Sequence, residues 1–175
     1  MTSLPVGNSR TQCICGRVVL ETTGKPILSA ACYCGDCRNG AREIEALPGA
    51  SAILDAEGGT ELLLFRKDRM RCTQGADLLR DMRLREDSPT RRVVAGCCNT
   101  ALFLDFEKGH WYSLYRARFM GEAPPLAMRL NMGKRAKELA PDDAVPRYAT
   151  FAWGFIGKIL AARVAMLFGN KMGSE

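Results

Sequence analysis

The cysteines are the residues of this chain whose type and spacing could do chemistry. There are eight among 175 residues, and five of them stand close together as Cys13-x-Cys15 and Cys32-x-Cys34-x-x-Cys37. In a reducing compartment, cysteines clustered in this way are more often metal ligands than disulfides. Because ligating thiols are deprotonated, such clusters bind soft or borderline cations, and zinc is the commonest of these.

Cys13 and Cys15 have the spacing of two ligands to one metal ion. Side chains at positions i and i+2 of an extended segment project to the same side, and tetrahedral zinc requires sulfur atoms about 3.8 Å apart. The pair needs two further ligands, and Cys97 and Cys98, which follow an expected turn at Gly96, are the natural candidates. The alternative is that one of these two is a ligand and the other a small buried side chain.

Cys32, Cys34 and Cys37 lie within a six-residue segment and can occupy one face of a single zinc ion. No fourth ligand stands nearby in the sequence, and an open fourth position distinguishes catalytic zinc from structural zinc. Water or a substrate thiolate would fill it. An iron–sulfur cluster is the alternative, but the C-x-C-x-x-C spacing departs from the usual ferredoxin patterns.

Two further residues, Cys72 and His110, have side chains that could take part in such a site. Cys72 stands alone in a predicted strand, and we expect it to belong to the core rather than to a metal site. His110 is the only histidine, and it follows a turn beside two aromatic residues. A general-base role is open to it, but a turn histidine without such a role is the commoner case.

Charge and composition limit the classes of partner. The formal net charge is +6, yet the basic residues are interleaved with acids and lack aromatic neighbours for base stacking, so we expect no nucleic-acid partner. The first eight residues lack a basic segment followed by an apolar run, so we expect no secretory signal and a cytoplasmic location.

Hydrophobic alternation and frequent turn residues predict a mainly β fold. Residues 1–11 are expected to be a loose leader, and residues 12–33 to form a hairpin with its turn at 22–26. Further short strands are predicted at 50–54, 60–65, 68–73, 79–85, 91–96, 101–106 and 111–116. The prediction is a zinc-binding β domain over residues 1–140, followed by a C-terminal helical extension over residues 141–175.

Within this extension, residues 149–168 form an apolar segment that predicts one helix. Lys158 and Arg163 lie inside it, and a charge at the centre of a bilayer costs a few kcal/mol, so we expect no transmembrane span. Packing of this helix on the domain or on a partner, such as a second copy in a homo-oligomer, is favoured over contact with a membrane surface.

The cysteine motifs resemble those of the glutathione-dependent formaldehyde-activating enzyme family, which shares its fold with the centromere protein V domain. The family patterns are C-x-C-G-x-V, C-H-C-x-x-C and F-C-x-x-C-G-[ST]. Residues 13–18 match the first fully, and residues 32–37 match the second with Tyr33 in place of histidine. In the third, Cys98-Asn99-Thr100 stands for C-G-[ST], Ala95 replaces the first cysteine, and Cys97 is a candidate to take over its role. The resemblance covers residues 12–115.

The resemblance implies small zinc-bearing β-sheets in a β-tent arrangement. It implies a structural zinc held by Cys13, Cys15 and Cys98, and a more labile, catalytic zinc held by Cys32, Cys34 and Cys37, where the family is thought to engage glutathione. The function so implied is a carbon–sulfur lyase similar to S-(hydroxymethyl)glutathione synthase, acting on the adduct of a small thiol and an aldehyde. The alternative is a non-catalytic binding module in which zinc serves folding alone.

Overall fold

The fold is mainly β with a C-terminal helix, as the hydrophobic pattern predicts, and its strands form two sheets. The structure, a computed structural model, describes residues 8–134 and 143–168. The small sheet has the order β10-β1-β2-β5, with strands β10 (Phe119–Met120), β1 (Asn8–Gln12), β2 (Val19–Thr23) and β5 (Met70–Gln74). The predicted domain boundary between residues 140 and 141 lies outside the described residues.

The large sheet has the order β11-β3-β4-β9-β8-β7-β6. Its strands are β11 (Met128–Leu130), β3 (Leu28–Cys32), β4 (Thr60–Arg66), β9 (Trp111–Tyr115), β8 (Thr100–Phe106), β7 (Thr90–Ala95) and β6 (Leu79–Met82). All neighbours are antiparallel except β11 and β3, which run parallel. Single 3-10 turns, η1 (Lys67–Arg69), η2 (Ala76–Leu78) and η3 (Arg116–Arg118), join several of the strands.

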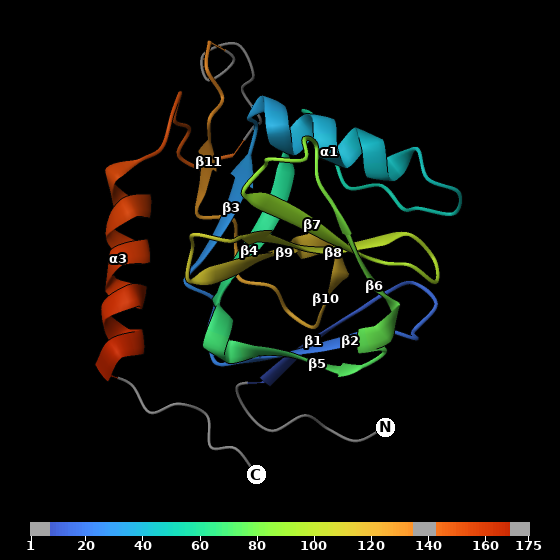
Figure 1. Ribbon diagram of the computed structural model, residues 1–175. Helices are drawn as coiled ribbons and strands as arrows, with labels where there is room; N and C mark the ends of the chain where they lie inside the picture. The colour runs from blue at the N-terminus through green and yellow to red at the C-terminus, as the bar shows by residue number, and fades with distance from the viewer. Residues whose placement is uncertain (1–7, 135–142, 169–175) are drawn as a thin grey trace.

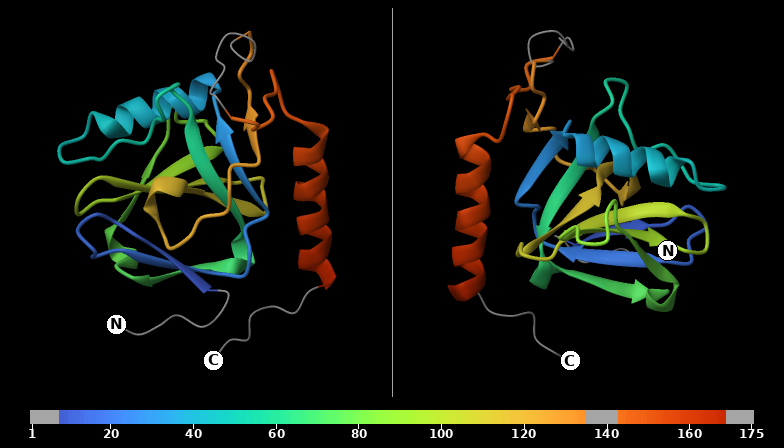
Figure 2. Two further views of the ribbon diagram at one scale, coloured as in Figure 1. Left: turned by 180° about the vertical axis from the view of Figure 1, so that it is seen from behind. Right: turned by 45° about the horizontal axis from the view of Figure 1, so that its top comes forward.

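The large sheet has apolar side chains on both faces. Along β4, Leu63 and Phe65 face the small sheet and pack with Val18 and Leu20, as expected where side chains alternate along a strand. Leu62 and Leu64 point to the opposite face, where two helices cover the sheet through Ile44 and Ile159. These helices are α1 (Gly35–Glu45) and α3 (Trp153–Phe168). Figure 1 shows α1 across one end of the strands and α3 beside them, and both views of Figure 2 keep α3 at the side of the body.

Several predicted elements differ from the structure. The hairpin over residues 12–33 is wrong, because β2 pairs with β1 and β5, whereas β3 pairs with β4 and β11. Residues 8–11 of the expected leader belong to strand β1, whose backbone hydrogen bonds come from its pairing with β2 and β10. Residues 50–54 contribute only an isolated bridge between Leu54 and Thr60. The tail helix begins at Trp153 rather than at residue 149.

A buried ion-pair network fixes the register of the outer strands of the large sheet. Asp105 of β8 lies opposite Arg91 of β7 and pairs with it, and its other oxygen is 2.6 Å from Lys67 Nζ. Arg91 also reaches Asp81 of β6 at 2.6 Å. Burial alone would raise the pKa of the Asp105 carboxyl, but the hydrogen bonds from Lys67 and Arg91 lower it below its usual value.

Replacing Asp105 with asparagine should therefore destabilise the protein at neutral pH. Lys67 and Arg91 would lose the carboxylate that they share, at a cost of about 1.5–3 kcal/mol, since both cations are part-exposed and Arg91 keeps Asp81. Because the folded pKa is depressed, the carboxylate stabilises the fold above its unfolded pKa of about 3.9, and this stability is lost as the pH falls through the lower folded value. Urea unfolding of the wild type and Asp105→Asn should show a constant gap from about pH 8 to about pH 5, which narrows only below about pH 4. A gap that narrows already near neutral pH would contradict the assignment.

Candidate metal centre

Four cysteines from two distant turns meet at one end of the interface between the sheets. Cys13 and Cys15 lie in the turn between β1 and β2, where Gly16 adopts φ 75° and its N–H donates to the Cys13 carbonyl at 2.9 Å. Cys97 and Cys98 lie in the turn between β7 and β8, which Asn99 closes with φ 53°. We call Cys13, Cys15, Cys97 and Cys98 the first cysteine cluster.

The sulfur atoms of the first cluster have the spacing of tetrahedral zinc ligands. Cys13 Sγ lies 3.5 Å from Cys15 Sγ and 3.8 Å from Cys97 Sγ. Cys97 Sγ lies 3.4 Å from Cys15 Sγ and 3.8 Å from Cys98 Sγ, and all four sulfurs lie within 4.8 Å of one another. An ion with metal–sulfur bonds of about 2.3 Å needs edges of about 3.8 Å, so these residues fit a four-thiolate metal site. The structure brings both Cys97 and Cys98 to the cluster, rather than one of them alone.

Backbone and hydroxyl groups contact the sulfur atoms of this cluster, and the pKa values of its thiols shift in opposite directions. The Val18 N–H donates to Cys13 Sγ at 3.3 Å, and Thr100 Oγ1 lies 3.0 Å from Cys98 Sγ. The backbone N–H and the guanidinium of Arg17 lower the pKa of the exposed Cys15 thiol to about 6. Desolvation, together with the neighbouring sulfurs, raises the pKa of Cys97 to about 12. A cation inside the cluster would remove this conflict among close thiols, because it stabilises every thiolate at once.

The second cysteine cluster is Cys32, Cys34 and Cys37, and it stands where β3 passes into α1. Cys32 is the last residue of β3, Cys34 is the N-cap of α1, and Cys37 lies in its first turn. Helix α1 is absent from the elements predicted from the sequence. C-x-x-C nevertheless suits a helix start, since a side-chain acceptor at the N-cap satisfies a free backbone N–H. Here Cys34 Sγ accepts from the Cys37 N–H at 3.4 Å.

The three sulfurs of the second cluster also lie within 4.8 Å of one another. Within the described parts of the chain, no histidine, aspartate, glutamate or further cysteine completes this group. Hydrogen bonds from Cys32 and Cys37, with backbone N–H groups of the first turn of α1, hold the pKa of Cys34 far below that of an ordinary thiol. Gly35 and Asp36 are exposed, so the end of the helix that carries this cluster faces solvent.

The comparisons with known proteins place the chain in a family. The sequence profile of a family of unknown function (DUF6151) matches residues 9–174. The chain belongs to this family. No curated protein matches the chain. A solved structure from Rhodobacter sphaeroides, described only as a protein of that organism, is similar at 16% identity over 79% of this chain and 99% of its own, with a TM-score of 0.47.

In this DUF6151 chain, two residues beside the second cluster are not among those predicted from the sequence. Asn131, with φ 56°, directs its amide Nδ2 to Cys32 Sγ at 3.5 Å. Arg92 of β7 is 3% exposed, and its Nη2 donates to the Asp36 carbonyl at 2.5 Å. A buried guanidinium against the start of α1 would offset part of the negative charge that three thiolates would bring. Sequence spacing offers no clue to either residue, because each comes from a distant strand or turn.

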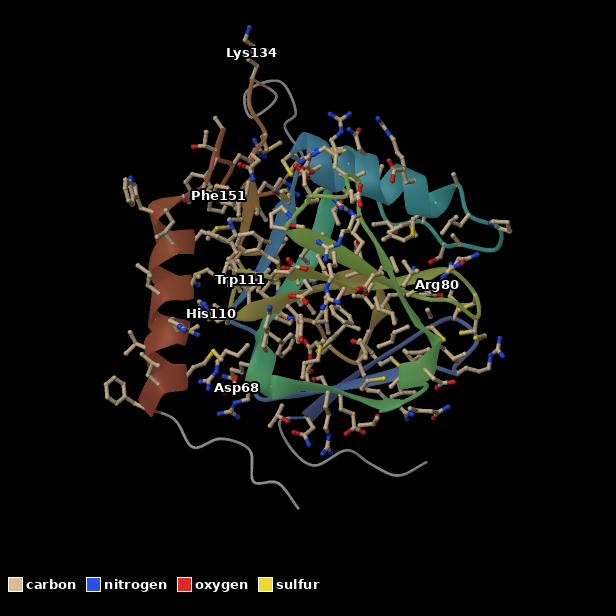
Figure 3. The ribbon with its side chains drawn as sticks, in the orientation of Figure 1. Asp68, Arg80, His110, Trp111, Lys134 and Phe151 are labelled. Atoms are coloured by element: carbon tan, nitrogen blue, oxygen red, sulfur yellow. The ribbon has the colours of Figure 1, made fainter. Side chains whose placement is uncertain are left out.

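The remaining two candidates lie outside both clusters. Cys72 is half-buried and packs against the core between the sheets, as expected, and its thiol lies 3.2 Å from the Gln74 carbonyl. His110 faces α3, as Figure 3 shows, and its Nε2 lies 2.9 Å from the Ile159 carbonyl. Desolvation lowers the pKa of His110, which favours the neutral ring in that contact. The histidine therefore serves the packing of the C-terminal helix.

Proposed function

We propose that this protein is a zinc-dependent enzyme of carbon–sulfur bond chemistry that acts on a thiol–aldehyde adduct at the second cysteine cluster. The observation that carries the proposal is the difference between the clusters: four sulfurs in the first and three in the second. A four-thiolate site has no room for substrate and serves folding, whereas a three-ligand site leaves one position for an incoming group. The likeness of residues 13–18 and 32–37 to the motifs of the formaldehyde-activating family supports the same division.

The residues around the second cluster would prepare a thiol for reaction. Zinc bound there would supply a Lewis acid that lowers the pKa of an incoming thiol. Cys32, Cys34 and Cys37 would hold the ion, and Asn131 would orient Cys32. The thiol loses its proton to water, its sulfur forms a bond to the aldehyde carbon, the carbonyl π electrons move to oxygen, and that oxygen takes a proton back from water. The reverse reaction breaks the carbon–sulfur bond and returns both molecules. A peptide thiol similar to glutathione fits this chemistry.

One observation favours the alternative, a zinc-stabilised binding module without catalysis. Tyr33 stands where the motif of the formaldehyde-activating family has histidine, and its buried hydroxyl donates to Asp55 Oδ2 at 2.9 Å. Desolvation and this carboxylate raise the pKa of Tyr33 well above its usual value. A phenol held in this way braces the loop over residues 55–59 and does not move protons. In this alternative, both metals would serve folding alone.

Cysteine-to-serine substitution at Cys34 tests the proposal. We expect purified Cys34→Ser to remain folded and to hold one zinc per chain instead of two, measured by elemental analysis and circular dichroism. X-ray absorption of the wild type should give an average of about 3.5 sulfurs per zinc, since one site has four thiolates and the other has three and a light atom.

Activity is measured with 13C-labelled formaldehyde and glutathione. The wild type should accelerate exchange between the free compounds and their adduct, seen by NMR exchange spectroscopy, and Cys34→Ser should not. If wild-type protein with zinc at both sites leaves the exchange rate unchanged, the enzyme proposal fails and the binding module remains. A fully reduced preparation without zinc would overturn both.

A further inference from the structure

The C-terminal helix α3 contacts the body of the protein through one narrow stripe. Ile159 is 8% exposed and packs in the core on the outer face of the large sheet, and Phe155 joins it. Ala162 and Met166 are half-buried and continue the stripe at the helical spacing of three and four residues. Every other residue of α3 is exposed. The helix is therefore attached along one side and bare around the rest of its circumference.

The exposed side of α3 is apolar, which is unusual for a surface helix. Its large exposed side chains are Trp153 (88%), Ile156 (39%), Leu160 (60%), Val164 (53%), Leu167 (70%) and Phe168 (87%). At 3.6 residues per turn, these project from the side opposite the Ile159 stripe. Phe151, just before the helix, is 55% exposed, and its ring packs on Phe155 with 5.2 Å between the centroids, beside the start of α3 in Figure 3. A contiguous apolar face of this kind marks an interaction surface.

The charges of α3 show what kind of partner would cover this face. Lys158 and Arg163 are the only charged residues of the helix, and both are exposed. They are about 140° apart around the helix axis, so one stands on each flank of the apolar face. Lys158 also lines a mainly apolar groove of 780 Å³, to which Lys25 adds a second cation and Glu122 one anion.

A second copy of the chain is a poor match for this pattern. Two α3 helices packed face to face would bring cations to flanks that offer no acidic residue of α3, and like charges at such positions oppose pairing. An anionic lipid surface is complementary, because phosphate groups meet the flanking cations while the apolar side chains enter the acyl boundary. The 16 residues of α3 extend about 24 Å, less than the roughly 30 Å of a hydrocarbon core. Among the described residues, no helix has the length and apolar character to cross a bilayer.

We propose that α3 binds the surface of an anionic phospholipid bilayer. The helix lies in the plane of the surface, with Trp153, Leu160 and Leu167 in the boundary and Lys158 and Arg163 among the phosphates. The opposite stripe keeps the β body attached above the surface, so both cysteine clusters remain in water. This proposal does not depend on metal binding or on the enzyme.

The test uses the full-length protein with vesicles of phosphatidylcholine alone or with about 30% phosphatidylglycerol. Because a buried apolar contact and two cations contribute together, we expect the anionic vesicles to bind at least about tenfold more tightly, with a blue shift of tryptophan fluorescence. Leu160→Asp combined with Leu167→Asp should abolish binding, and Lys158→Glu with Arg163→Glu should remove the preference for anionic lipid. The matched control is Lys108→Glu with Lys134→Glu, which makes the same charge change at exposed sites outside α3 and should bind as the wild type does, apart from a small electrostatic loss.

Four results would overturn the proposal. Three concern vesicles: the folded wild type fails to bind anionic vesicles, binds both vesicle types equally, or loses no more binding in the α3 charge pair than in the control pair. The fourth is a wild-type dimer in sedimentation that Leu160→Asp with Leu167→Asp converts to monomer without changing binding to vesicles. The last result would assign the face to a second copy. Circular dichroism checks that the β body of each variant is folded. We expect it to be, because both aspartates replace exposed side chains.

Discussion

Cys15→Ser should remove one metal ion from the protein and cause a large loss of stability, although Cys15 is an exposed residue. Burial cannot account for such a loss, so it would come from the metal. Cys15 Sγ lies 3.5 Å from Cys13 Sγ and 3.4 Å from Cys97 Sγ, and serine is a poor zinc ligand at neutral pH. A structural zinc contributes on the order of 10 kcal/mol, which is comparable with the whole stability of a typical domain.

We therefore expect Cys15→Ser to be largely unfolded, or to melt at least about 10 °C below the wild type with one zinc per chain. Thermal melts by circular dichroism and elemental analysis measure both. Cys72→Ser is the matched control, because Cys72 lies outside both clusters and should retain two metals. Cys34→Ser should stay folded. If Cys15→Ser behaved like the Cys72 control, the first cluster would not be a structural metal site.

Gly40→Ala should destabilise the protein by about 2–4 kcal/mol, in contrast to most changes of glycine to alanine within helices. A Cβ at Gly40 would stand 1.9 Å from Arg92 Nε and 2.4 Å from Arg92 Cζ. Arg92 is 3% exposed and cannot move to solvent without leaving its place beside the start of α1. The substitution would thus displace a buried cation that offsets the charge of the second cluster, and should also weaken metal binding there.

Gly35→Ala is the matched control in the same helix, because nothing lies within 4 Å of its Cβ position. It should leave the free energy of unfolding within about 1 kcal/mol of the wild type. Truncation of the clashing side chain supplies a second check, since Gly40→Ala and Arg92→Ala should be strongly non-additive in urea unfolding. Additive effects would show that Gly40 and Arg92 do not share this space.

The strands that could be predicted are those whose residues alternate and whose ends carry strong turn signals. The segments predicted at 60–65, 91–96, 101–106 and 111–116 correspond to β4, β7, β8 and β9 within a residue or two at each end. Pairing was harder, because alternation shows which side chains share a face but not which strand is the neighbour. Thus the turn before Pro26 is typical of a hairpin, yet it carries the chain from one sheet to the other.

The grouping of the cysteines could be predicted because it depends on sulfur spacing more than on the fold. The spacing of Cys13 and Cys15 predicts a shared metal ion, and the need for two more ligands points to Cys97 and Cys98, which the structure brings within 4.8 Å of them. Helix α1 could not be predicted from hydrophobic period, since its buried residues are only Gly40, Ala41 and Ile44. The parts that sequence could not show, Asn131 and Arg92, reach the second cluster through tertiary packing.

The two clusters differ in the length of the loop that must close before their sulfur atoms meet, and this difference would set the order in which they take up metal. The second cluster lies within one short segment, whereas Cys13 and Cys97 are 84 positions apart. Loop closure costs more entropy as the loop lengthens, and the first cluster also requires the turns of two different sheets to be adjacent. In a chain that refolds in the presence of zinc, the second cluster would therefore fill early and the first cluster last. The four sulfurs of the first cluster can come together only after both sheets have formed.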